Sequence, residues 1–153
     1  MATRHLSRII VLQTLYEWSF WGYPEGKWQE IFERNLKEFG QDIDEPDFPK
    51  RLIEGIIKNL NFIDEIIRKS SKNWPFEHIP LMEKNILRIA IYEIYFQNKN
   101  EVPIKVAINE AIELAKNFIT EASAKFINGV LGTVYENYLA EQNAKESLKS
   151  QGN

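Results

Sequence analysis

The sequence contains no cysteine and only two histidines, His5 and His78. Disulfide bonds and thiolate metal sites are therefore excluded, and nucleophile–histidine catalysis has little to build on. His78 has no second histidine at ligand spacing, so we interpret it as structural or exposed. Glu110 and Glu113 are three residues apart on one helix face, but the Glu-x-x-His pairs of di-iron bundles are missing. These absences point away from an enzyme and from a bound metal or cofactor, and they fit a reducing cytoplasm.

Long apolar runs are also missing. The longest candidate, residues 85–96, is interrupted by Arg88 and Glu93 and falls short of the roughly 20 residues that span a bilayer. The first residues, MATRHLSR, have one short basic patch and no signal-peptide cleavage pattern. The motif GVLG at 129–132 lacks the lysine and the preceding strand of a phosphate-binding loop. We therefore expect a cytoplasmic protein without a membrane segment.

The charge is unevenly distributed along the chain. The net charge is −3 at pH 7, which argues weakly against a nucleic-acid partner. Between Glu17 and Asp47 there are nine acids and three bases, so this stretch carries −6 and the remainder carries +3. A chain with an acidic sector and a mildly basic remainder can still present one basic face to phosphates.

Apolar side chains recur at three- and four-residue spacing along most of the 153 residues, and no segment alternates as a strand does. This pattern predicts an all-α fold in a single domain over residues 1–140. The last helix should be capped by Thr120 or Ser123, and the polar residues 141–153 predict a disordered tail. The six expected helices cover approximately residues 3–21, 24–39, 47–70, 81–98, 103–118 and 123–139.

Three of these helices carry specific expectations. The helix over 47–70 has a continuous apolar stripe, which is typical of core packing. The helix over 81–98 is apolar around most of its circumference and should lie at the centre of the bundle, with Arg88 in a buried pair, for instance with Glu110 or Glu113. Gly129 and Gly132 lie inside the last helix, where glycine is unfavourable, so we expect another backbone to approach closely there.

Four motifs in order resemble the NusB family of bacterial transcription antitermination factors. These are QTLYEW near the start, EKNILRIAIYE in the middle, VPIKVAINEAIELAKNF, and KFINGVL in the last helix. The resemblance as a whole covers roughly residues 4–139. The resemblance implies an all-helical fold of two perpendicular three-helix bundles, here with subdomains at about 3–72 and 81–139.

The resemblance also implies a function and two surfaces. NusB-like factors pair with NusE, a small-subunit ribosomal protein, and bind the boxA element of rRNA leader transcripts, so that RNA polymerase resists termination. The implied RNA surface combines a basic N-terminal segment with the region between the fifth and sixth helices: Arg4, His5, Arg8, Lys116, Phe118, Glu121 and Lys125. The implied partner surface contains Tyr16, Glu83 and their neighbours Trp18 and Lys84. We expect Arg4 and Arg8 to lie together on the surface of the first helix.

Two other functions are compatible with a helical protein of this kind. One is a NusB-like module of an RNA-modifying enzyme, such as an rRNA cytosine methyltransferase; no methyltransferase domain follows in these 153 residues. The other is a protein–protein adaptor without an RNA role.

The sequence departs from the family pattern at Leu6 and Ser7, which fall within the N-terminal arginine cluster, and at Ile119, where relatives often have glycine. Some relatives form homodimers that hide the RNA surface.

Overall fold

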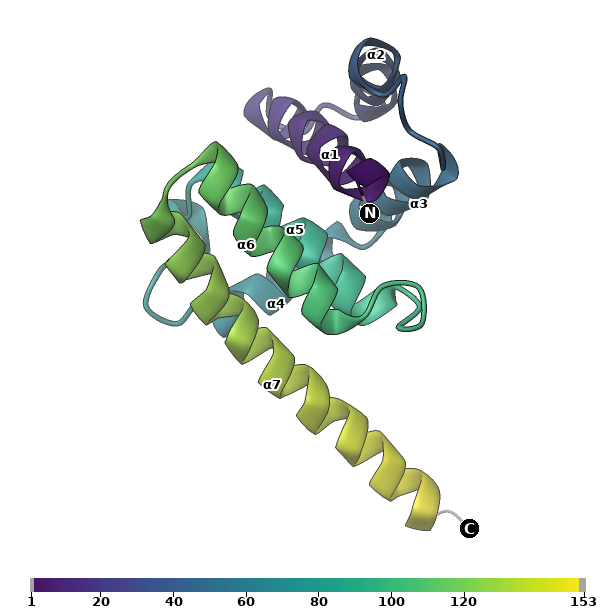
Figure 1. Cartoon of the computed structure of the whole chain (residues 1–153). Coiled ribbons are helices and arrows are strands. Elements are labelled where there is room, and N and C mark those ends of the chain that lie inside the picture. The colour runs from purple at the N-terminus through teal and green to yellow at the C-terminus, as the bar shows by residue number, and fades with distance from the viewer. Residues whose placement is uncertain (1, 152–153) are drawn as a thin grey trace.

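The computed structural model describes residues 2–151, and within this range it contains α-helices, one short 3₁₀ helix and no strand (Figure 1). The fold is therefore all-α, as the apolar periodicity predicts. Its elements are α1 (Ala2–Phe20), α2 (Trp28–Phe39), α3 (Asp47–Lys58), α4 (Leu60–Ser70), η1 (Phe76–His78), α5 (Leu81–Phe96), α6 (Ile104–Phe118) and α7 (Glu121–Gln151).

The predicted third helix is wrong in one respect, because it is two helices. α3 ends at Lys58 and α4 begins at Leu60. Between them Asn59 leaves the helical conformation at φ −109° and ψ 21°, and both its backbone N–H and its side-chain amide donate to the carbonyl of Gly55. These bonds satisfy a carbonyl at the end of α3. The chain changes direction there, and α4 packs against α5 and α7.

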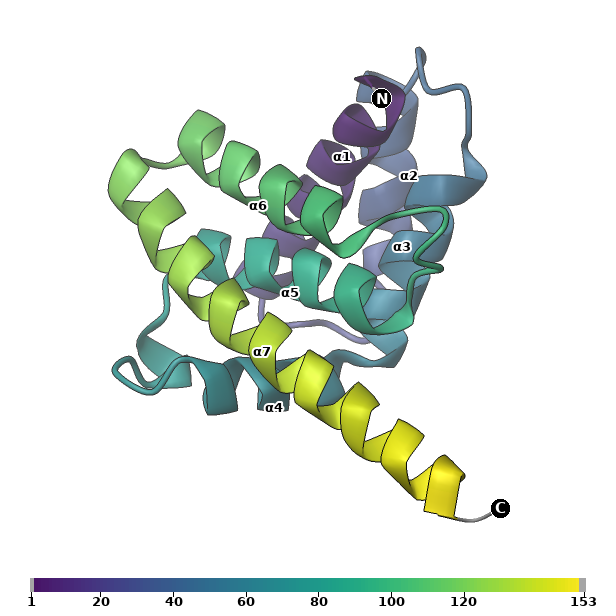
Figure 2. The same cartoon turned by 60° about the horizontal axis from the view of Figure 1, so that its bottom comes forward.

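The helix α5 lies at the centre of the molecule, as its apolar circumference predicts. It packs against α1, α3, α4, α6 and α7, and Figure 2 shows it running between α6 and α4 while α7 crosses them. Leu87 and Ile91 are fully buried within it. The one large core of the molecule is therefore organised around α5.

Arg88 is buried in α5 and paired, as expected, but its partner is neither Glu110 nor Glu113. Its guanidinium donates to both carboxylate oxygens of Asp64 in α4, at 2.8 and 3.0 Å. It also donates to the hydroxyl of Tyr23 at 3.0 Å. Burial alone would lower the pKa of Arg88, but the hydrogen bonds and charge of Asp64 raise it. A charged group thus fastens α4 to α5 inside the core.

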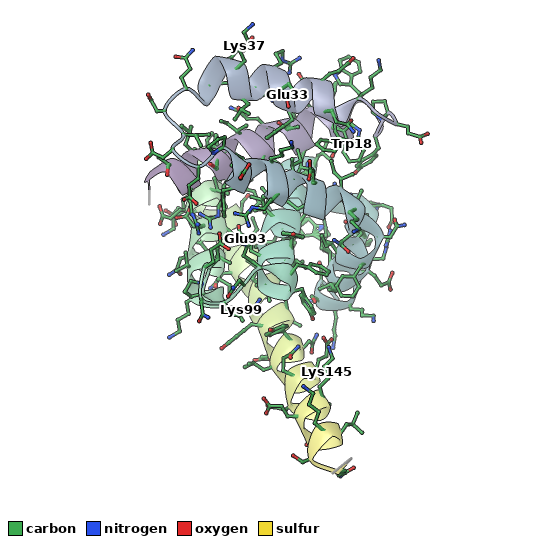
Figure 3. The ribbon with its side chains drawn as sticks, turned by 90° about the vertical axis from the view of Figure 1, so that its right-hand side faces the viewer. Trp18, Glu33, Lys37, Glu93, Lys99 and Lys145 are labelled. Atoms are coloured by element: carbon green, nitrogen blue, oxygen red, sulfur yellow. The ribbon has the colours of Figure 1, made fainter. Side chains whose placement is uncertain are left out.

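Residues 141–151 do not form the predicted disordered tail, because α7 continues to Gln151; residues 152–153 lie outside the described residues. Its second half projects from the body of the molecule (Figure 1), and Lys145 lies on this projecting part (Figure 3). The stretch AEQNAKES consists mostly of residues with good helix propensity. Local propensity therefore continues the helix where packing against the core has stopped.

Close backbone approach at Gly129 and Gly132 is not found. A Cβ atom built at either glycine meets nothing within 4 Å, and both residues are exposed. The crowded glycine is instead Gly55 in α3, where a Cβ would overlap the ring of Tyr92 from α5. Gly129 and Gly132 were expected to be crowded because they lie inside a helix. Crowding depends instead on which neighbouring side chains lie against the glycine.

Replacing Gly132 by alanine should raise the free energy of unfolding by about 1 kcal/mol, because helix propensity improves and no neighbour is displaced. Urea denaturation with linear extrapolation measures the change. Gly55→Ala is the matched control, since there the same gain in propensity is opposed by the overlap with Tyr92. A loss of stability in Gly132→Ala would contradict the open surroundings of this residue.

Candidate nucleic-acid and partner interfaces

Arg4, in the first turn of α1, is held by two carboxylates and a ring. Its guanidinium donates to Glu45 at 3.2 and 3.3 Å, to the Glu101 carboxylate at 3.1 Å and to the Glu101 carbonyl at 3.2 Å. It also lies over the ring of Phe48, 4.5 Å from its centroid. The hydrogen bonds from Arg4 lower the pKa of Glu45. Arg4 remains partly exposed, so a phosphate can reach it only in competition with these carboxylates.

Arg8 does not lie on the surface as expected. Only 2% of it is exposed, and its guanidinium forms two hydrogen bonds of 2.8 Å with the carboxylate of Glu93 in α5. Burial alone would lower the pKa of Arg8, but these hydrogen bonds and the charge of Glu93 raise it. The four-residue spacing does put Arg4 and Arg8 on one face, but that face turns toward the interior.

His5 connects α1 to α6. Its Nδ1 atom lies 2.8 Å from a carboxylate oxygen of Glu110, and about a third of the side chain is exposed. Glu110 also lies 3.9 Å from the guanidinium of Arg8. The three N-terminal residues of the implied RNA surface are thus brought together at the start of α1, where His5 and Arg4 are accessible and Arg8 anchors the helix.

The remaining residues of the implied RNA surface lie at the corner between α6 and α7. Phe118 ends α6 with 45% of its surface exposed, and Lys116, Glu121 and Lys125 are exposed as well. The hydroxyl of Thr120 accepts a hydrogen bond of 3.0 Å from the Ser123 N–H, which confirms the predicted cap of α7. Phe118 follows Glu110 by eight residues, or about 12 Å of helix, so α6 links the two groups.

Lys125 opens onto a groove that was not expected from the sequence. This groove, with a volume of about 620 Å³, lies between the connection after α4 and the first turns of α7. Trp74 is 43% exposed and packs edge to face on Phe126, with 5.4 Å between the ring centroids. An aromatic residue between Asn73 and Pro75 in a polar connector was the available signal. We call it the Trp74 groove; its lining residues are Ser70, Ser71, Lys72, Asn73, Trp74, Lys125, Phe126, Gly129, Val130, Thr133, Glu136 and Asn137.

Tyr16 lines a second groove, of about 520 Å³, between α1 and α2. Its rim carries large exposed apolar side chains: Phe20, Trp21 and Phe39 are 62%, 69% and 53% exposed. So many exposed aromatic side chains in one place indicate an interaction surface rather than ordinary solvent-facing helix. We call this surface the Tyr16 groove; its lining residues are Gln13, Tyr16, Glu17, Phe20, Trp21, Arg34, Asn35, Phe39 and Met82.

The implied partner residues do not all face outward. Glu83 in the first turn of α5 is half-buried, does not line the groove, and accepts a hydrogen bond of 3.4 Å from Ser123 at the start of α7. Trp18 is 6% exposed and donates from its indole nitrogen to the carbonyl of Pro24 at 2.9 Å; Figure 3 shows it inside the α1–α2 side of the molecule. Lys84 is 8% exposed. Trp18 and Lys84 are therefore buried residues and not exposed contacts of this surface.

Lys84 is unusual among the buried groups. Its ammonium lies 4.1 Å from the ring centroid of Phe76. Arg68 lies over the same ring at 4.2 Å. Burial lowers the pKa of Lys84. Lys84 and Arg68 thus hold η1 against the start of α5 and the end of α4. These contacts set the position of the connection that bears Trp74.

Among residues 2–151, no three His, Asp or Glu side chains are grouped so that they could hold a metal ion. None of the helices described is long and apolar enough to cross a lipid bilayer.

Comparison with known proteins gives a consistent result. The model of the NusB family matches residues 5–136. The chain is 38% identical over 143 residues to the transcription antitermination protein NusB of Chloroflexus aggregans, covering 94% of this chain and 93% of the relative. It is 44% identical over 132 residues to the protein of the same name from a Dehalococcoides mccartyi strain, covering 86% and 89%.

Solved structures agree with the sequence relatives. T. maritima NusB matches with a TM-score of 0.77 and 34% identity, over 87% of this chain and 90% of that one. A chain from the crystal structure of antitermination factors NusB and NusE in complex with dsRNA matches with a TM-score of 0.78 and 25% identity, over 90% and 99%. The family match extends from the first turn of α1 into the middle of α7 and includes the whole Tyr16 groove and all of the Trp74 groove except Asn137. The chain belongs to the NusB family.

Proposed function

We propose that this protein is a transcription antitermination factor that binds a boxA-like single-stranded element of rRNA leader transcripts together with NusE. The observation that carries the proposal is the extent of the family match, residues 5–136, which includes the Tyr16 groove and the stretch from His5 to Lys125. A protein of this kind acts on nascent RNA within the RNA polymerase antitermination complex, and hence in the bacterial cytoplasm. It binds and positions, and we assign it no catalytic step.

The RNA surface that we propose runs from His5 along α6 to the α6–α7 corner. Lys116 and Lys125 supply positive charge for phosphates, and the exposed ring of Phe118 supplies a face on which an unpaired base can stack. Arg4 joins them when phosphate displaces Glu45. Arg8 contributes by fixing α1, since its guanidinium is occupied by Glu93.

Replacing Lys116 and Lys125 together by alanine should flatten the dependence of log affinity on log salt by up to about 1.4 units, about 0.7 for each phosphate contact on a single strand. Fluorescence titration of boxA-like RNA at several salt concentrations, with and without NusE, measures the slope. Lys37→Ala with Lys145→Ala is the matched control, because these lysines are exposed on other parts of the molecule (Figure 3). An unchanged slope in the first variant would remove both lysines from the RNA surface.

For the partner we propose the Tyr16 groove, together with Glu83 in the first turn of α5, as the surface that receives NusE. Apolar anchors that fill pockets provide most of the energy of a protein interface. Phe20, Trp21 and Phe39 are placed to be such anchors because they are exposed around one groove. A homodimer of this chain remains a prediction, and the molar mass in solution without NusE decides it.

Phe39→Ala should weaken NusE binding by more than about 1 kcal/mol and leave the melting temperature nearly unchanged, because the side chain is half-exposed at the rim. Isothermal titration calorimetry with NusE measures the affinity. Phe62→Ala is the control, since Phe62 is 47% exposed and lies outside the groove. Equal weakening by both variants would show that the Tyr16 groove is not the partner surface.

A further inference from the structure

Gly129 occupies a position in α7 that the packing of the helix does not explain. Glycine is among the least favourable residues in a helix interior, and a common reason to keep it is close contact with a neighbour. Here a Cβ atom would meet nothing within 4 Å. The space beside Gly129 is the Trp74 groove, whose lining includes this residue. A side chain at this position would therefore project into the groove and fill part of it.

The same groove contains a buried hydroxyl without a partner. Ser70 is 7% exposed, and its Oγ atom makes no hydrogen bond within the part of the chain that the structure describes. Buried polar atoms are nearly always hydrogen-bonded, so such an atom calls for a specific explanation. Ser70 lines the groove, but its Oγ atom has almost no accessible surface, so a ligand in the groove must displace the atoms that cover Oγ in order to become its partner.

The other lining groups define the chemistry of that ligand. Trp74 offers an aromatic wall that is 43% exposed and is held in place by Phe126. Asn73 and Asn137 offer amides that both donate and accept hydrogen bonds. These groups suit a planar aromatic ring with polar atoms along its edge.

The charges of the groove suggest how such a ligand is oriented. Lys125 lies one helical turn before Gly129 and Glu136 lies about two turns after it, while Lys72 lines the groove from the opposite side. The groove is therefore positive near the start of α7, close to the α6–α7 corner, and negative at its far end. An anionic backbone attached to the ring would lie at the α6–α7 corner.

We propose that the Trp74 groove is a pocket for one unpaired nucleotide base of the bound RNA. The base stacks on Trp74, its edge reaches the Ser70 hydroxyl, its phosphate lies near Lys125, and Gly129 forms the floor that keeps the pocket open. This inference rests on the proposed RNA-binding function and adds a base-recognising site to it. A peptide segment of a protein partner is the competing occupant, and it lacks the regular phosphate that the lysines would bind.

The test compares two glycines of one helix. Gly129→Leu places a side chain in the groove, whereas Gly132→Leu places the same side chain on the same helix outside it, and neither meets a neighbour within 4 Å at Cβ. Both variants should melt at or above the temperature of the unaltered protein, because leucine is the better helix former. In titrations with boxA-like RNA and NusE, Gly129→Leu should lose on the order of tenfold or more in RNA affinity, the effect of one lost stacking contact. Gly132→Leu should bind as the unaltered protein does.

A second measurement identifies the base. RNAs in which one nucleotide at a time is abasic are titrated against the unaltered protein. At one position, removal of the base should lower the RNA affinity by about as much as Gly129→Leu does. At that position, removal of the base should hardly change the affinity of Gly129→Leu, because its pocket is already closed. The same holds for Trp74→Leu, because the aromatic wall of its pocket is missing. A loss that persists undiminished in both variants overturns the pocket.

The outcomes separate this inference from the proposed function. If the unaltered protein binds boxA-like RNA but Gly129→Leu binds it equally well, the pocket is refuted and the function stands. If Gly129→Leu leaves RNA binding intact and weakens a protein partner instead, the occupant is a peptide and the inference is wrong. If the unaltered protein with NusE shows no salt-dependent binding to boxA-like RNA, both the function and the pocket fall.

Discussion

Replacing Arg8 by alanine should lower the free energy of unfolding by about 3–5 kcal/mol, the cost of leaving a buried charge without its partner. The side chains of Arg8 and Glu93 are 3% and 1% exposed, so water cannot replace the lost hydrogen bonds. Two bonds of 2.8 Å are broken at once. Chemical denaturation followed by circular dichroism measures the loss, and the start of α1 should be the first part to loosen.

The control for this prediction removes both charges. Arg8→Met combined with Glu93→Leu replaces the pair by apolar side chains, and such replacements of buried ion pairs are often neutral or stabilising. The double variant should therefore be more stable than Arg8→Ala. If Arg8→Ala costs less than about 1 kcal/mol, Arg8 is not buried as the structure has it, and its role as a direct RNA contact should be reconsidered.

Leu87→Ala should lower the free energy of unfolding by about 2–5 kcal/mol. Leu87 is fully buried in α5, and α5 packs against five other helices. Removing the branched side chain loses apolar burial and leaves a cavity that the surrounding helices can close only in part. Thermal and urea denaturation provide the measurement.

Leu148→Ala is the matched control for the core position. The same change of side chain is made in α7, but Leu148 is 69% exposed on the projecting part. Its effect should stay within about 0.5 kcal/mol, as for most surface substitutions. If Leu87→Ala and Leu148→Ala lowered the free energy of unfolding by similar amounts, burial in α5 would not control the stability of the molecule.

Much of the fold follows from apolar periodicity, because periodicity reports which residues share a face. It correctly identified α5 as the central helix, and of the two cap candidates, Thr120 and Ser123, the structure shows Thr120 accepting from the Ser123 N–H. It could not detect the break at Asn59, since the apolar stripe of residues 47–70 continues in register across it while the backbone turns. Nor could it detect that α7 persists beyond residue 140, where helix propensity acts without a buried face.

The surfaces were harder to predict because they depend on which face each residue shares with distant segments. Arg8 was expected outside because it is charged, but Glu93, 85 positions further along the chain, is there to pair with it. Trp18 lies two residues after Tyr16 and Lys84 lies one residue after Glu83, and in a helix these offsets are enough to turn both side chains into the core. The Trp74 groove joins residues 70–74 to residues 125–137, and only the tertiary structure places these segments side by side.

The central position of α5 has a consequence for how the molecule unfolds. The start of α5 lies beside the Tyr16 groove through Met82, while Glu93 near its end holds the α1 segment of the proposed RNA surface. The helices that pack on α5 cannot separate from it without exposing its buried faces to solvent. The amide protons of α5 therefore exchange with solvent only when the whole body opens, whereas those of the projecting end of α7 exchange through local fraying. The proposed partner surface and the proposed RNA surface thus belong to one cooperative unit.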